Sequence, residues 1–284
     1  MPLSNFSNIF NCIHLRSGKI ISGIALLFIL FPSSRCAYSQ NMEYGLFGGI
    51  AYYLGDLNPG VHFRNIQPAY GIFGRYNIDP RWAVKLSATR GKVKSFSGNS
   101  NYLPERQLGF ESPVTDVSAV AEFNFFPYIT GSHRNYFTPY IYAGVCVFWF
   151  NPSSNGQLLR PLGTEGQNIG FEGRKPYATY SFGIPFGLGV KYGLSSKIGL
   201  TLFWEMHKTF TDYLDDVSKT YYLNGNAIDP NNPAEILSDP TTSHQPGMQR
   251  GNSNTNDWYS FTGITISYKF NLPGSKKCKD IYAK

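Results

Sequence analysis

Three aspartates stand close together in this sequence and are candidates for binding a metal ion. Asp212, Asp215 and Asp216 lie at the start of a polar stretch that runs to residue 256. Carboxylates at this spacing suit Ca²⁺, which prefers oxygen ligands. The stretch lacks the glycine and terminal glutamate of a helix–loop–helix calcium site, so the alternative is that these acids are solvated and form a turn. The three aspartates are weak metal candidates, and no residues indicate a cofactor.

A glutamate and a histidine two residues apart could form an acid–base pair. Together with a serine nucleophile, Glu205 and His207 would supply the groups of a membrane-embedded lipid hydrolase. Their segment alternates apolar and polar residues, and both fall on the polar face. A hydrolase that acts on lipid needs these groups on the apolar face, so we do not expect an enzyme.

Two cysteines remain once an N-terminal export segment is set aside. Cys146 lies on the polar face of its segment, and we predict a small buried filler there. Cys278 lies in a basic tail with Lys276, Lys277 and Lys279. A thiol with basic neighbours in an oxidising compartment favours an intermolecular disulfide. The alternative is an unpaired or modified thiol in a flexible tail. No Cys-x-x-Cys or His-x-x-x-His pair suggests a zinc site.

The first 39 residues have the pattern of a secretory signal peptide. Arg16 and Lys19 precede an apolar run over 20–31, and Ala37 to Ser39 form a small-x-small cleavage site. The run is too short to span a hydrocarbon core of about 30 Å as a helix, which argues against a membrane anchor. A lipoprotein signal at Cys36 is not favoured, because Arg35 precedes it. Removing this segment lowers the net charge from +7 to +4, too little to indicate nucleic acid.

The remaining chain alternates apolar and polar residues in segments of about ten, the pattern of strands that cross an outer membrane. The clearest segment is 178–192, in which Phe182, Phe186 and Leu188 share one face while the other face is small or polar. Pro185 interrupts it, because a closed sheet has no edge for a missing N–H, and we predict a bulge there. The eight predicted strands are 42–54, 69–78, 82–91, 115–126, 139–150, 178–192, 198–209 and 257–270.

One face of these strands is predicted to meet lipid and the other to fill the barrel. The lipid-facing set includes Tyr52, Met206 and all four Trp, which lie at or near segment ends as aromatic girdles do. An eight-stranded barrel has an interior filled by side chains, so charges there are expected to pair. The predicted lumen charge network consists of Glu43, Arg75, Lys85, Glu122, Lys191 and Glu205, with His207 beside it. A proton or ion path is the alternative.

Connections alternate between short and long, which sets the predicted orientation. Short connections cover 77–81, 127–138 and 193–197, and long ones cover 56–68, 92–114, 151–177 and 212–256. Outer-membrane barrels have short periplasmic turns and long outer loops. We therefore predict an all-β, eight-stranded antiparallel outer-membrane β-barrel over 40–270, with long extracellular loops, both termini in the periplasm and a periplasmic basic tail over 271–284. A hairpin within 212–256 would make ten strands.

Six stretches carry a resemblance to a known family. They are YYLGDLNP at 52–59, PAYG at 68–71, FNFFPY at 123–128, RPLGTEGQ at 160–167, IPFGLGVKY at 184–192 and KTFTDYLDDVS at 208–218. In this order they resemble the PorG-type outer-membrane barrels of Bacteroidota, over roughly residues 43–270. The resemblance implies a non-enzymatic role in type IX protein secretion, anchoring or organising the periplasmic ring of a PorK-type lipoprotein and a PorN-type protein, and no catalytic residues. The resemblance does not extend to the tail that contains Cys278.

The alternative function is a general small barrel in outer-membrane lipid. Such a barrel would bind lipid or small solutes through its loops, or through a lateral opening near Pro185.

Overall fold

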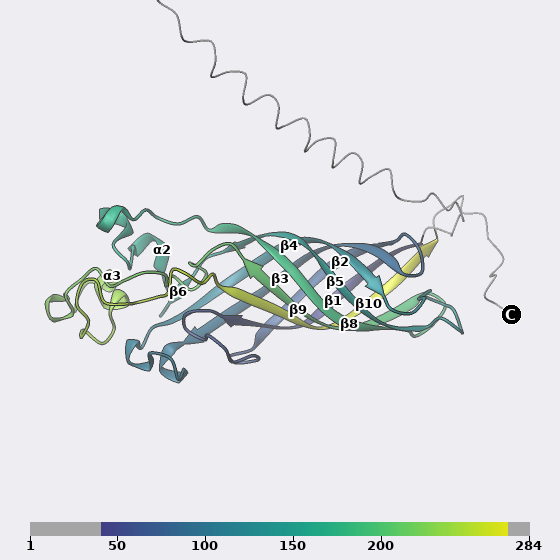
Figure 1. Ribbon diagram of the computed structural model, residues 1–284, viewed down its shortest axis with the longest axis horizontal. Coiled ribbons are helices and arrows are strands. Elements are labelled where there is room, and N and C mark those ends of the chain that lie inside the picture. The colour runs from purple at the N-terminus through teal and green to yellow at the C-terminus, as the bar shows by residue number, and fades with distance from the viewer. Residues whose placement is uncertain (1–40, 272–284) are drawn as a thin grey trace, which may run out of the picture. The chain divides into compact units, whose positions relative to one another are not determined.

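The computed structural model describes residues 41–271 (Figure 1). The predicted signal peptide and the tail with Cys278, Lys276, Lys277 and Lys279 lie outside the described residues. No helix in the described part of the chain is long and apolar enough to cross a membrane.

Eight long strands form the wall of a closed barrel. They are β1 (Asn41–Leu54), β2 (Gln67–Asn77), β3 (Trp82–Phe96), β4 (Gly109–Asn124), β5 (Phe137–Phe150), β8 (Tyr180–Gly193), β9 (Ile198–Thr209) and β10 (Trp258–Asn271). Each pairs antiparallel with the next long strand along the chain, and β10 pairs with β1. A sheet closed in this way has no free edge and satisfies its own backbone groups. The predicted eight-stranded antiparallel barrel is confirmed.

Shorter elements lie in the connections at one end of the barrel. They are η1 (Ser97–Asn99), η2 (Pro104–Arg106), β6 (Ser153–Ser154), β7 (Gln157–Leu158), α2 (Leu159–Leu162), η3 (Gln167–Ile169), η4 (Phe171–Gly173), η5 (Gly225–Ala227) and α3 (Pro233–Ser238). β6 and β7 form a two-residue hairpin beside β4 and are not part of the wall. The described loop between β9 and β10 adds no wall strand, so ten crossings are excluded.

Outward side chains form an apolar belt around the barrel. Leu46 and Val145 are 67% and 66% exposed, and Ile72, Phe182 and Leu202 are exposed in the same way. Continuous apolar surface of this kind is unfavourable in water and typical of strands that contact lipid.

The β3–β4 hairpin extends beyond its predicted length. β3 continues to Phe96 and β4 begins at Gly109, and the alternation of buried and exposed residues persists throughout. The outward residues change from Val84 and Leu86 to Arg90, Lys92 and Lys94, all of them exposed. Because this extension has lost its apolar outward face, the lipid-facing pattern does not reveal it.

Pro185 interrupts the wall without a bulge. β5 and β8 pair at Ala143–Phe186 and at Cys146–Gly183, and no pair lies between them. The register is the same on both sides of this gap, and β8 continues to pair with β9 at Pro185. The missing N–H of proline leaves a ladder position unbonded, but no extra residue is inserted. The predicted bulge is wrong.

One loop covers part of the outward face. Tyr52 and Met206 lie on the predicted lipid-facing side, yet both are buried. The Tyr52 hydroxyl is 3.1 Å from His62 Nδ1, and its ring centroid is 4.9 Å from that of Phe63. The same hydroxyl accepts a hydrogen bond of 2.8 Å from Trp204 Nε1. Strand parity alone places these side chains in lipid, whereas His62 and Phe63 cover Tyr52, and Met206 lies 3.6 Å from the Tyr52 hydroxyl.

Candidate functional site

A first ion-pair network crosses the lumen near the short turns. Arg75 Nη1 lies 2.9 Å from Glu43 Oε2, and Arg75 Nε lies 2.8 Å from Glu122 Oε2. Lys191 Nζ lies 2.6 Å from Glu122 Oε2 and donates to Asn124 Oδ1 at 2.9 Å. These side chains come from β1, β2, β4 and β8 and are fully buried, so they join opposite sides of the wall.

Aromatic rings fill the space around the lumen cations. Lys191 Nζ lies 4.5 Å from the ring centroid of Tyr140, and Lys85 Nζ lies 4.9 Å from that of Tyr142. Lys85 also lies 3.8 Å from Glu205, the sixth member of the predicted network. The lumen is therefore occupied by paired side chains, as expected for eight strands.

A second polar cluster lies deeper in the lumen, toward the long loops. His207 Nε2 is 2.9 Å from Glu205 Oε1, and His207 Nδ1 is 3.5 Å from Asp116 Oδ2 and 3.6 Å from Cys146 Sγ. The Tyr259 hydroxyl donates to Asp116 Oδ2 at 2.8 Å. One ligand atom each from Asp116, Cys146 and His207 lie within 4.8 Å of one another, close enough to share an ion.

Both members of the proposed lipase pair are in this lumen cluster. Glu205 and His207 are buried and face away from the lipid belt. Cys146 beside them is 5% exposed. The geometry therefore gives no support to a lipid hydrolase. Cys146 is buried as predicted, but it faces polar partners and is more than a filler.

The four long connections form one ordered unit, which we call the long-loop cap (residues 55–66, 97–108, 151–179 and 210–257; Figure 1). At its centre is Arg250, which donates to the Asp216 carbonyl at 2.6 Å and to Glu165 Oε1 at 3.2 Å. Glu165 accepts backbone hydrogen bonds from Ser218 and Lys219 at 2.9 and 3.0 Å. The side chains of Arg250, Glu165 and Asp216 are all buried.

Two further arginines join the remaining loops to this centre. Arg106 donates to the Arg250 carbonyl and, at 2.7 Å, to the Asp56 carbonyl. Arg174 donates to the Glu165 and Thr220 carbonyls at 2.9 and 2.7 Å. Each guanidinium thus supplies donors to carbonyls that have no strand partner. These arginines were not predicted from the sequence, because a loop arginine carries no periodic signal.

The structure separates the three candidate metal ligands. Asp216 accepts hydrogen bonds from Thr164 and, at 2.6 Å, from Tyr177. Burial raises the pKa of Asp216 to about 6, although Arg250 acts in the opposite direction. Asp215 instead accepts a hydrogen bond of 2.6 Å from the Tyr53 hydroxyl. The predicted trio is therefore not a single ligand set.

Asp215 belongs to a carboxylate cluster drawn from two loops. Tyr53 bridges Asp215 and Asp257, with hydrogen bonds of 2.6 and 2.7 Å. Burial, followed by the charge of Asp257, raises the pKa of Asp215 well above its usual range. Burial raises the pKa of nearby Asp56 to about 6. Asp212 is 9% exposed, and neither of its carboxylate oxygens has a hydrogen-bond partner among the described residues.

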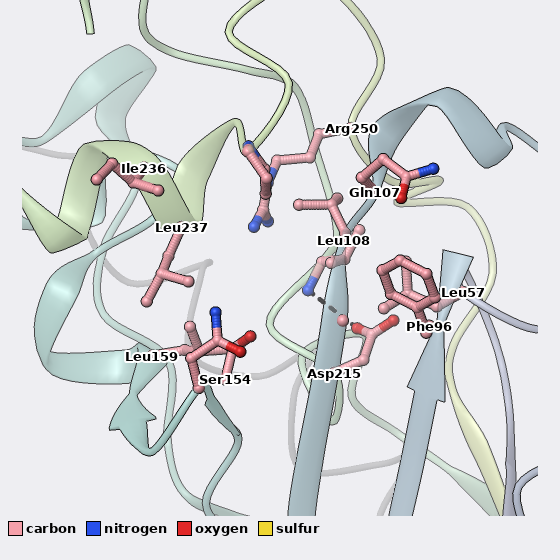
Figure 2. A pocket seen from close by; sticks show the side chains of 14 residues that line it. Leu57, Phe96, Gln107, Leu108, Ser154, Leu159, Asp215, Ile236, Leu237 and Arg250 are labelled. Carbon is pink, nitrogen blue, oxygen red and sulfur yellow. Dashed lines mark hydrogen bonds between the residues drawn. The ribbon is translucent and has the colours of Figure 1, made fainter. Parts of the chain in front are cut away.

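A small pocket of about 160 Å³ opens within the cap. Leu57, Leu108 and Leu237 are among its lining residues, together with the polar side chains of Asp215 and Arg250. Figure 2 shows Asp215 and Arg250, with Gln107 and Ser154, beside aliphatic side chains contributed by several loops. The pocket can take a small group that has both polar and apolar parts.

A closed eight-stranded wall, an apolar belt and a filled lumen define a barrel of the outer-membrane type. The chain belongs to the family described as "Domain of unknown function (DUF6089)", which matches residues 22–226. No curated protein matches the chain.

Solved structures of small barrels are similar in fold. Neisserial surface protein A (NspA) is 11% identical, with a TM-score of 0.42, 82% of this chain covered and 98% of that one. Ail of Yersinia pestis, solved with the heparin analogue sucrose octasulfate, is 9% identical, with a TM-score of 0.42 and coverage of 82% and 100%. OprG from Pseudomonas aeruginosa is 12% identical, with a TM-score of 0.37 and coverage of 83% and 99%. At these identities the likeness concerns the fold alone.

Proposed function

We propose that this barrel is a non-enzymatic component of the type IX protein secretion machinery and anchors or organises the periplasmic lipoprotein ring at the outer membrane. The observation that carries the proposal is the filled lumen. Buried ion pairs and rings occupy it, so the barrel's surfaces and not its interior are available for function. The secretion role itself comes from the resemblance of the six sequence stretches to PorG-type barrels.

Those stretches include residues that build the long-loop cap. Asp56, Glu165 and Asp216 come from three different stretches, and all are buried in the cap or bonded to its arginines. The resemblance thus includes residues that fix the shape of one end of the barrel. This supports a shared architecture with the PorG-type barrels.

The ring partners would contact the short-turn end. The described chain begins and ends there, since Asn41 pairs with Asn271. Residues 125–136 form the longest connection at this end and expose His133 and Arg134. We propose this turn and the basic tail as the contact surface for a PorK-type lipoprotein and a PorN-type protein, with both termini in the periplasm.

Affinity purification from detergent-solubilised membranes tests the proposal. The full-length barrel should recover a ring lipoprotein, and the double variant His133→Glu, Arg134→Glu should recover at least tenfold less, because it reverses the charge of the proposed contact. Lys175→Glu, an exposed charge reversal in the cap, is the matched control and should not change recovery. Folding is checked by heat-modifiable mobility on a gel. Absence of the lipoprotein with a folded barrel would refute the proposal.

Cys278 gives a covalent form of the same contact. A non-reducing gel should show a heavier species that disappears on reduction and is missing in Cys278→Ser. If wild type shows no such species, the tail has no disulfide partner and contributes charge alone.

A second candidate function rests on the cap pocket. Its volume and its mixed lining, in which aliphatic side chains lie beside Asp215, Arg250 and Gln107, suit a small solute or the end of a lipid tail. Mass spectrometry of the purified barrel should then detect a bound small molecule that is lost in Leu237→Trp, which fills the pocket. Ile169→Trp, at an exposed cap position, is the control. An identical extract from both variants would argue against ligand binding there.

A further inference from the structure

We propose that Asp116, Cys146 and His207 form a binding site for a zinc-class divalent cation inside the barrel. The three residues come from β4, β5 and β9, and all are buried. They provide a carboxylate, a thiolate and an imidazole, the ligand types that Zn²⁺ takes in proteins. Since they lie far apart in the sequence, no spacing motif reveals them.

The distances match the edges of a coordination sphere. Bonds of about 2.0–2.3 Å to a tetrahedral zinc place neighbouring ligand atoms about 3.3–3.6 Å apart. His207 Nδ1 lies 3.6 Å from Cys146 Sγ and 3.5 Å from Asp116 Oδ2. The nitrogen–oxygen distance is longer than a good hydrogen bond. Two of the three edges thus have the length expected for ligands of one ion, and all three ligand atoms lie within 4.8 Å of one another.

The second ring nitrogen of His207, Nε2, has the type of partner that metal-bound histidines usually have. His207 Nε2 lies 2.9 Å from Glu205 Oε1, a hydrogen-bond distance. A metal-bound histidine usually donates its second N–H to a carboxylate, which fixes the tautomer and orients the ring. With the proton on Nε2, the lone pair of Nδ1 points toward Asp116 and Cys146. The His207 ring also stacks on Tyr259, with centroids 4.3 Å apart and planes at 17°.

Gly183 leaves room for the sulfur of Cys146. A Cβ at Gly183, opposite Cys146 in the sheet, would lie 3.0 Å from Sγ, so a larger residue would press on the thiol. The Tyr259 hydroxyl lies 3.9 Å from Sγ and 2.8 Å from Asp116 Oδ2. It is therefore in contact with two of the three proposed ligands.

The charge of the lumen is compatible with a bound ion. Among the described strand residues, the buried ionisable groups are four carboxylates, three cations and one histidine: Glu43, Asp116, Glu122, Glu205, Arg75, Lys85, Lys191 and His207. One positive charge is missing from this balance. A divalent ion with a Cys146 thiolate supplies it, and so does a proton on His207. The alternative to a bound metal ion is therefore a protonated His207 that lies between Asp116 and Glu205. The two alternatives differ in whether the cluster contains a metal ion.

Metal analysis of the full-length barrel, extracted in detergent, separates these alternatives. After refolding from urea with Zn²⁺, the protein should retain about one zinc ion per chain through dialysis. Refolding with Co²⁺ should give a thiolate-to-cobalt charge-transfer band. Cys146→Ser should lose the band and lower the retained zinc at least tenfold. Glu205→Gln should retain the ion but bind it about 10–100-fold more weakly, because it acts through His207.

Controls address folding and chance binding. Ser87→Ala changes a lumen hydroxyl that bonds to Ser118, outside the cluster, and should keep the ion. Heat-modifiable mobility on a gel reports folding, and Asp116→Asn replaces Cys146→Ser if the latter does not fold. Folded wild type without zinc or a cobalt band would overturn the proposal. So would metal that persists in both ligand variants, since that metal is an adventitious ion only.

Discussion

Asp212 is a buried carboxylate with no hydrogen-bond partner among the described residues. Burial, followed by the charge of Asp257, raises its pKa to about 9. The folded state therefore holds this proton more tightly than the unfolded state, and stability falls as pH rises from about 4 to about 9.

Asp212→Asn should remove this loss of stability. At pH 9 we expect the variant cap to be more stable than wild type by about 1–3 kcal/mol, the range for a buried group left unpaired, with little difference at pH 4. Hydrogen exchange of cap amides, corrected for intrinsic rates, measures this. Asp229→Asn, at an exposed loop position, is the control. An unchanged pH dependence in Asp212→Asn would contradict the assignment.

Proximity in the sequence did not predict which aspartates lie together in the structure. Asp215 and Asp216 are adjacent, yet they bond to Tyr53 and Tyr177 respectively, and Asp216 has a positive φ of 66°. Asp257, which completes the cluster with Asp215, comes from the far end of the same loop. Such convergence depends on how the loop folds back, and no residue spacing encodes it.

Charge pairs along the strands should differ strongly in their contribution to stability. Glu122→Gln leaves Lys191 without its buried counter-charge and leaves Arg75 with Glu43 alone, and we expect a loss of about 3–5 kcal/mol. Glu111→Gln breaks a solvent-exposed pair with Lys92 on β3 and β4, and should cost about 0–1 kcal/mol. Urea unfolding in detergent compares them. Equal losses would mean that the lumen pairs are solvated.

Pro185 weakens one ladder position, and restoring the N–H should strengthen it. Pro185→Val supplies a donor opposite the gap between β5 and β8, and we expect a gain of about 1 kcal/mol in the free energy of unfolding. Val190→Ile, a small change on the same strand, is the control. A destabilised Pro185→Val variant would show that the gap is too tight for a regular ladder.

Strands were predictable where one face meets lipid. The period-two pattern located all eight wall strands, because lipid and lumen impose opposite chemistry on alternate residues. It failed at the β3–β4 extension, where outward Lys92 and Lys94 replace the apolar face. It also misplaced Tyr52, since tertiary cover by a loop is invisible to parity.

At the scale of the whole molecule, the closure of the barrel was predictable from the number of strands. The structure of the long-loop cap was not predictable from the sequence. Each cap arginine bonds to backbone carbonyls of other loops, and these contacts depend on the complete loop structure. The composition of the lumen was predictable because polar residues on the inner face must find partners there. The joining of Asp116, Cys146 and His207 required the register of three strands.

The filled lumen predicts that the barrel does not conduct ions. Wild type in a planar bilayer should give no stepwise current under conditions in which a 16-stranded porin, with its aqueous channel, conducts. Replacing 219–250 by a short Gly-Ser linker removes much of the cap but none of the Arg75–Glu122–Lys191 pairs, and should also give no current. Current in wild type would show that the lumen is open. Current only after the cap is shortened would place the seal in the loops, because the lumen pairs are the same in both proteins.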